Sequence, residues 1–207
     1  MTTVVMIHRG GDVVAGWDSM VTNGTHSVSS MTHDKVWVQG GVTYGFAGNL
    51  RTLDILQTTK FPEYTEGDAR KWITTTWVPT LIESIKDNPF AFDKEEGVLK
   101  GVALLMVVGG RVFDVDDSMC PAECEDGVYA IGTGSDFARG ALLSGATVMQ
   151  ALTIARDCDA FTGGTLTAKS VKQMIKDASI EEKAEADLRI LRGKANGKKS
   201  KANTPTR

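Results

Sequence analysis

Thr2 is the residue whose position gives it the clearest chemical use in this sequence. It follows Met1 and directly precedes the apolar run Val4-Val5-Met6-Ile7. A threonine hydroxyl is a weak nucleophile that needs a base, and an N-terminal threonine carries one in its own α-amino group. The reference pKa of that amine is about 7.7–8.0, and a nearby cation lowers it. Removal of Met1 would therefore create a nucleophile, although a small second residue is also common in chains without this chemistry.

Other kinds of site find little support in the sequence. Cys120 and Cys124 have no second ligand pair, and the three histidines stand at no ligand spacing, so we expect no metal site. Gly132-Thr133-Gly134 lacks the third glycine of a dinucleotide loop, because Phe137 stands at that position. The chain has no Gly-x-Ser-x-Gly elbow. We therefore expect neither a metal nor an organic cofactor.

Composition and charge favour a single folded domain over residues 1–192 with a basic tail at 193–207. The chain has 207 residues, 42% of them hydrophobic and 22 of them glycine, which suits one sizeable core with many tight turns. The tail carries five basic residues and no acid, so the formal charge of −3 hides a body of −8. An acidic body argues against nucleic acid as the main partner, and the tail is either solvated or a docking arm. No run is long and apolar enough for a membrane span, there is no secretory signal, and we expect a cytoplasmic protein.

Glycine pairs divide the strand-forming segments into hairpins. Gly10-Gly11, Gly40-Gly41 and Gly109-Gly110 each join two short apolar runs, which is a hairpin signal. The three predicted hairpins cover residues 4–15, 35–47 and 102–115, and a further strand covers 127–131. The runs are apolar on both faces, which indicates sheets covered on both sides.

Helical periodicity occupies the segments between the hairpins. Apolar residues recur at three- and four-residue steps over 69–85, where Pro79 predicts a kink or a division into two pieces. Further helices are expected at 50–58, 135–145, 147–157 and about 170–192, with Ser135 and Thr147 as N-caps. Segregated hairpins and helices predict an α+β fold, a four-layer αββα sandwich of two antiparallel sheets between helix layers.

Six short motifs in order give the chain a family resemblance. They are Thr2-Thr3-Val4-Val5, Asp18-Ser19, Lys35-Val36, Gly45-Phe46-Ala47-Gly48, and the later pair Ala130-Ile131-Gly132-Thr133-Gly134 and Asp159-Ala160-Phe161-Thr162-Gly163-Gly164. The set, spanning a motif-bearing core of residues 2–164, resembles proteasome β-type subunits and the bacterial HslV-type threonine peptidase, which are N-terminal-nucleophile hydrolases. The segment between Asp18 and Lys35 is one residue longer than in the family, and Thr133 and Thr162 replace serines.

The resemblance implies a role for each matching residue. Thr2 would be the nucleophile and base, Lys35 the tuning cation and Asp18 its acidic partner. Gly48 would supply the oxyanion donor, and the polar side chains Thr133, Asp159 and Thr162 would position the amine and its water. On the substrate side, Thr22 would pair with an extended peptide, Phe46 would wall an apolar pocket, and Met20 stands where proteasome subunits often have arginine.

The function implied by the resemblance is that of a threonine endopeptidase in a self-compartmentalised protease. Its substrates would be unfolded proteins or peptides, its subunits would form homo-oligomeric stacked rings, and an ATP-dependent unfoldase ring would be its partner. Two alternatives stay open: a non-catalytic ring-forming subunit on the same fold, which would retain Met1, and a small-amide hydrolase with the same nucleophile.

Overall fold

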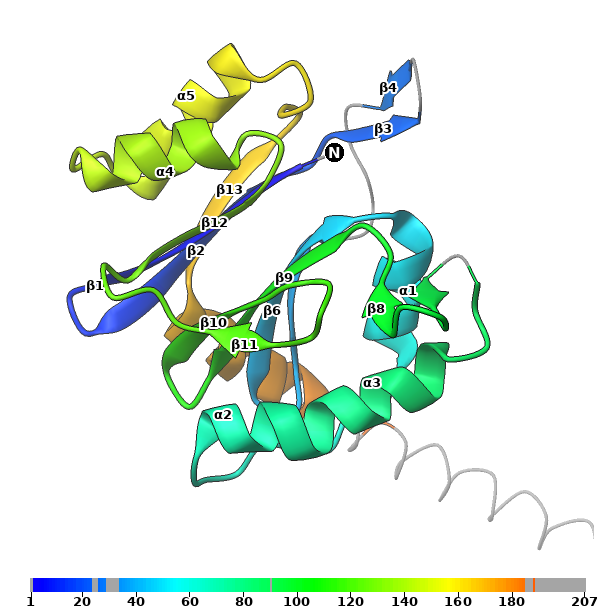
Figure 1. Cartoon of the computed structure of the whole chain (residues 1–207). Helices are drawn as coiled ribbons and strands as arrows, with labels where there is room; N and C mark the ends of the chain where they lie inside the picture. The colour runs from blue at the N-terminus through cyan, green and yellow to red at the C-terminus, as the bar shows by residue number, and fades with distance from the viewer. Residues whose placement is uncertain (1, 24–25, 29–33, 90, 185–187, 189–207) are drawn as a thin grey trace, which may run out of the picture.

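The computed structural model describes residues 2–23, 26–28, 34–89, 91–184 and 188 (Figure 1). Two antiparallel sheets form its centre. The first has the strand order β12-β1-β2-β13 and the second β11-β10-β9-β6-β5. The strands of the first sheet are β1 (Thr3–Arg9), β2 (Asp12–Asp18), β12 (Val128–Gly132) and β13 (Leu166–Ser170). Those of the second are β5 (Val36–Gln39), β6 (Val42–Gly48), β9 (Val102–Val108), β10 (Arg111–Val115) and β11 (Pro121–Ala122).

The three glycine pairs form the three predicted hairpin turns. Both residues of each pair have φ between 58° and 78°, the left-handed region that glycine enters without a steric penalty. Two successive left-handed residues make the hairpin turn whose twist matches that of the strands it joins. The predicted hairpins are therefore confirmed as β1–β2, β5–β6 and β9–β10.

Two short hairpins and the edge strand β13 were not predicted from the sequence. The hairpins pair β3 (Val21–Asn23) with β4 (His26–Val28) and β7 (Phe92–Asp93) with β8 (Val98–Leu99). Strand β13 pairs with β2 over five residues, from Leu166 opposite Asp18 to Ser170 opposite Val14.

Helices cover the outer face of each sheet, as Figure 1 shows. Helices α4 (Ser135–Leu143) and α5 (Val148–Cys158) lie on the first sheet, and Gly16 of β2 lets α5 come close, since a Cβ there would lie 2.3 Å from Val148 Cγ1. The second sheet is covered by α1 (Leu50–Thr58), α2 (Ala69–Trp72), the π-helical segment η1 (Ile73–Trp77) and α3 (Val78–Ile85). A third cluster of apolar side chains fills the space between the sheets. This arrangement confirms the predicted four-layer αββα sandwich.

Pro79 explains the π-helical segment in the long helix. Proline lacks an N–H and its ring crowds the preceding turn, so it is tolerated best at the start of a helix. Here it stands in the first turn of α3, and the N–H of Val78 reaches back to the carbonyl of Ile73. The predicted division of residues 69–85 is confirmed, with the irregularity lying just before Pro79.

The two N-cap predictions have different outcomes. Thr147 caps α5 in a full capping box with Gln150. Ser135 is not an N-cap, because Gly134 holds that position and Ser135 is the first helical residue. Gly134 is required there, since a Cβ would lie 2.3 Å from the Thr3 hydroxyl oxygen and 2.6 Å from that of Thr162.

The chain continues from β13 into a helix over residues 171–184. Its first residue, Val171, is buried in the cluster between the sheets, with Met174 and Ile175 partly buried beside it. The rest of the predicted helix beyond residue 184, apart from Leu188, and the predicted basic tail lie outside the described residues. In the ranges that the structure describes, no helix combines the length and apolar character needed to cross a bilayer.

Candidate active site

Strand periodicity places Thr2 between the two sheets. Side chains of a strand alternate between faces, so Thr2 shares a face with Val4 and Met6, which belong to the cluster between the sheets. Thr2 is only 3% exposed and lines two adjoining clefts. Its neighbour Thr3 points to the other face, toward α4 and α5.

The carboxylate of Asp18, at the end of β2, is the most heavily bonded group near Thr2. It is completely buried. Its Oδ1 accepts from the Thr3 N–H at 2.8 Å and from Lys35 Nζ at 2.9 Å. Its Oδ2 accepts from the N–H groups of Met20 and Gly163, each at 3.1 Å. One side chain therefore joins β1, the residue before β5 and the loop before β13.

Lys35 stands immediately before β5 and is 6% exposed. Its ammonium group donates to Asp18 and, at 2.5 Å, to the carbonyl of Met20. Burial lowers the pKa of Lys35 below its ordinary value, and the charge of Asp18 opposes that shift. The structure thus brings Lys35 into one of the clefts that Thr2 lines, with the buried Asp18 bonded to its ammonium group.

A second polar cluster joins the remaining predicted side chains. Asp159 Oδ2 accepts from the hydroxyls of Thr133 and Thr162, both at 2.7 Å. Thr162 Oγ1 also lies 2.5 Å from Thr3 Oγ1. Since the one hydroxyl proton of Thr162 goes to the carboxylate, Thr3 is the donor in that pair. Burial tends to raise the pKa of Asp159, but hydrogen bonds from Thr162, Thr133 and the Phe161 N–H outweigh it and lower the pKa.

Gly132 lets the main chain approach Thr2 closely. It pairs with Thr3 across the sheet and has φ +93°. A Cβ at this position would lie 2.0 Å from the Thr2 carbonyl oxygen. Any other residue would both strain the backbone and displace Thr2.

Two clefts meet at Thr2 and Gly48. The Phe46 cleft, of about 430 Å³, is lined by Thr2, Val21, Thr22, Lys35, Phe46, Gly48, Asn49, Leu50 and Leu53. The Asp117 cleft, of about 450 Å³, is lined by Thr2, Ala47, Gly48, Gly101, Val102, Ala103, Asp117, Gly132 and Thr133. An extended chain crossing Thr2 would occupy both clefts in turn.

Met20 lies outside both clefts, where a residue that contacts substrate would be expected. It lines neither cleft; its carbonyl binds Lys35, and its side chain lies against Gly163, where an added Cβ would be 2.3 Å from Met20 Cε. The prediction that Met20 contacts substrate is therefore not supported by its position, which is behind Lys35.

Two residues of this region, Thr3 and Asp117, were not predicted from the sequence as site residues. Thr3 links the Asp18 and Asp159 clusters through its N–H and its hydroxyl. A polar residue inside an apolar strand was the available signal. Asp117 follows β10 in an acidic turn, and nothing in its local sequence ties it to Thr2.

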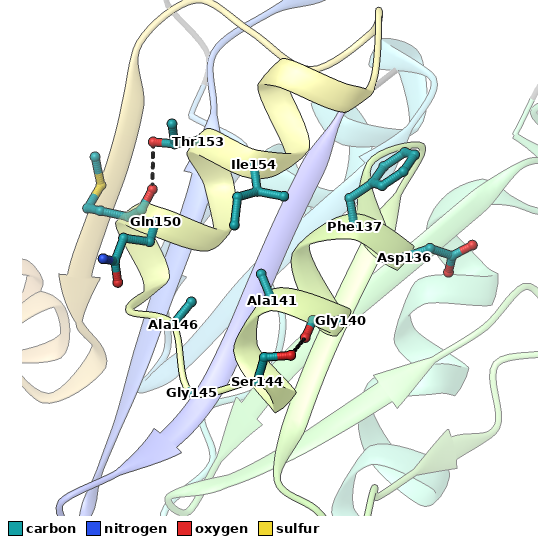
Figure 2. A pocket seen from close by; sticks show the side chains of 11 residues that line it. Asp136, Phe137, Gly140, Ala141, Ser144, Gly145, Ala146, Gln150, Thr153 and Ile154 are labelled. Atoms are coloured by element: carbon teal, nitrogen blue, oxygen red, sulfur yellow. Dashed lines mark hydrogen bonds between the residues drawn. The ribbon is translucent and has the colours of Figure 1, made fainter.

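A separate hollow lies away from this site, between α4 and α5 (Figure 2). It measures about 970 Å³, and Phe137, Met149 and Ile154 beside it are each more than 40% exposed. Its lining carries one carboxylate, Asp136, and otherwise only apolar, hydroxyl and amide side chains. The hydroxyl of Thr2 and the Lys35–Asp18 ion pair lie together at the other site instead.

Comparison with known proteins shows where this fold occurs. No protein-family model matches the sequence. The chain is similar to BPH of Thiobacillus denitrificans, with a TM-score of 0.66 and 16% identity over 82% of this chain and 97% of BPH. BPH in complex with epoxomicin matches at a TM-score of 0.65, with the same identity and coverage. Eukaryotic HslV from Trypanosoma brucei matches at a TM-score of 0.57 and 20% identity over 81% of this chain and 98% of HslV.

These likenesses confirm the predicted fold class. The chain has a four-layer αββα sandwich, as predicted from the sequence, and BPH and HslV are among its structural neighbours. At 16–20% identity the likeness concerns the fold. The function of this chain depends on the residues that it places on that fold.

Replacing Asp18 by asparagine tests the central carboxylate. The change leaves the buried ammonium of Lys35 without its counter-charge and sets an amide N–H₂ against donors. We expect the free energy of unfolding to fall by about 3–5 kcal/mol, measured by urea denaturation. Asp157→Asn, on the exposed end of α5, should change it by less than about 0.5 kcal/mol. Equal effects of the two variants would contradict the role given to Asp18.

The lowered pKa of Asp159 predicts a dependence of stability on acid pH. A carboxylate with a folded-state pKa below its unfolded value stabilises the fold above the unfolded pKa, about 3.9, and that stabilisation is lost as pH falls through the folded pKa. Asp159→Asn removes this titration, so its unfolding free energy should fall less steeply than the wild type's below pH 5. Chemical denaturation at several pH values measures both slopes, and parallel curves would contradict the prediction.

Proposed function

We propose that this protein is a threonine peptidase that uses Thr2 as its nucleophile. The observation that carries the proposal is that Thr2 lies where two clefts meet, beside the buried Lys35–Asp18 pair. A nucleophile, a cation that tunes it, an acid that holds the cation and a groove for the substrate are the parts that such a reaction needs.

The reaction begins once Met1 has been removed and Thr2 carries a free α-amine. Thr2 Oγ1 attacks the peptide carbonyl carbon, and the amine takes the hydroxyl proton. The positive charge of Lys35 lowers the amine's pKa and so favours its free-base form. The Asp159 cluster, with Thr133 and Thr162, holds the amine and a proton-carrying water in place.

Collapse of the tetrahedral intermediate divides the substrate. Its oxyanion receives a hydrogen bond from the Gly48 N–H, which we assign a value of about 3 kcal/mol in the transition state. The C–N bond breaks, the proton passes from the amine to the leaving nitrogen, and an acyl ester remains on Thr2. Water, deprotonated by the same amine, then hydrolyses the ester and restores Thr2.

The Phe46 cleft receives the part of the substrate before the cut. Val21, Phe46, Leu50 and Leu53 give it an apolar lining, which favours an apolar side chain at the residue whose carbonyl is attacked. Thr22 on β3 also lines this cleft, where an extended peptide would add to the strand by main-chain hydrogen bonds. A substrate held in this way must be an unfolded chain or a peptide.

We further propose that the subunits assemble into homo-oligomeric stacked rings that receive substrate from an ATP-dependent unfoldase. The resemblance to HslV supports this, and so do the exposed apolar side chains of α4 and α5, since such surfaces mark contacts with other chains. Native mass spectrometry should give a high multiple of the 22.2 kDa subunit. A monomer across the working concentration range would contradict the assembly.

Labelling with a peptide epoxyketone tests the mechanism directly. This warhead reacts with a hydroxyl and an α-amine on the same residue, so we expect one adduct on wild-type Thr2 and none on Thr2→Ala, read by intact-protein and peptide mass spectrometry. Thr74→Ala, which removes an exposed hydroxyl from η1, should label like the wild type.

The mass of the intact protein separates this proposal from its main alternative. A chain that keeps Met1 has no free amine on Thr2 and would fit a non-catalytic ring subunit. Absence of an adduct on protein that has lost Met1 would contradict the mechanism itself.

A further inference from the structure

The Asp117 cleft adjoins the apolar Phe46 cleft at Thr2 and Gly48. Both clefts include Thr2 and Gly48, so a substrate whose carbonyl is held at these residues extends into each cleft. Under the proposed function, the residue before the cut occupies the Phe46 cleft. The residues after the cut, which leave with the amine, therefore occupy the Asp117 cleft.

The lining of this cleft consists of small residues and one charge. Glycine at positions 48, 101 and 132 and alanine at 47 and 103 leave room for a long side chain. Asp117 is the only charged residue among the described residues that line it. A long side chain entering the cleft thus meets a carboxylate.

The turn that carries Asp117 is fixed by the fold. The Asp117 carbonyl accepts from the Leu99 N–H at 2.8 Å, which ties the turn to β8. Asp116 Oδ1 accepts from the Ser118 N–H at 3.0 Å, and its carbonyl accepts from the Met119 N–H, also at 3.0 Å. Met119 is 7% exposed and holds φ +61°, a costly conformation for a non-glycine residue that persists because the surroundings impose it.

The carboxylate of Asp117 is available to a substrate. Among residues 2–23, 26–28, 34–89, 91–184 and 188, no cation or hydrogen-bond donor pairs with it. Lys100, beside Gly101 of the cleft, lies 3.3 Å from Asp93 instead. Lys35, the cation of the other cleft, is bonded to Asp18.

We infer that Asp117 selects substrates with a lysine or arginine just after the cleaved bond. This inference rests on the proposed function and adds the substrate class of its leaving side. A basic side chain would lie along the small residues of the cleft and place its charge at the Asp117 carboxylate. A glutamate at the same position would be repelled.

Matched quenched-fluorescence peptides that differ only in the residue after the cut test this inference. We expect the wild type to cleave the lysine peptide with a kcat/KM about tenfold above that of the glutamate peptide. This ratio combines the attraction of lysine with the repulsion of glutamate at a partly exposed carboxylate. In Asp117→Asn this ratio should fall to about one, while Asp117→Glu should keep it. Raising the salt concentration should lower the wild-type ratio. Glu125→Gln, an exposed acid at the far end of β12 from Gly132, should leave it unchanged.

A peptide with alanine after the cut separates the two hypotheses. If Asp117→Asn cleaves the alanine peptide like the wild type and loses the lysine preference, the inference holds. If the alanine peptide is cleaved and the ratio is the same in wild type and Asp117→Asn, the inference is overturned and the proposed function stands. If wild type lacking Met1 cleaves none of the peptides, the proposed function is overturned and the inference with it.

Discussion

The buried carboxylate of Asp18 is the interaction on which the arrangement around Thr2 depends. Taking a carboxylate and an ammonium out of water costs several kcal/mol for each, and only a full set of hydrogen bonds offsets that cost. Asp18 obtains this set from three main-chain N–H groups and Lys35. Those donors come from four separate segments of the chain. The hydrogen bonds that offset the cost of burying the charge therefore also fix where β1, β5 and the loop before β13 meet.

Features with a local cause could be predicted from the sequence. The glycine pairs predict left-handed turns, the apolar runs predict strands, and Pro79 predicts an irregular helix. Each of these structures depends on residues only a few positions apart. The residues of the matched motifs lie close together: Thr2 and Gly48 line both clefts, Lys35 lines one of them and is bonded to the buried Asp18, and Thr133, Asp159 and Thr162 form one cluster.

Features with a distant cause could not be predicted. Strand β13 has modest apolar content and exists because β2 offers it an edge. Ser135 lost the cap position because Thr3 and Thr162, far away in the sequence, leave room only for glycine at 134. The role of Thr3, the place of Met20 behind Lys35 and the entry of Asp117 into a cleft all depend on contacts between segments more than ten residues apart, which no local pattern records.

The Gly10-Gly11 turn offers a place to attach a probe. Neither glycine has an atom within 4 Å of an added Cβ, so the turn projects into open space. Strand β1 runs from Thr3 to Arg9, which places Gly10 about 26 Å from Thr2 at 3.3 Å per residue. A short labelled peptide inserted at this turn would stay clear of both clefts. Such a reporter could follow the protein while its N-terminus remains free.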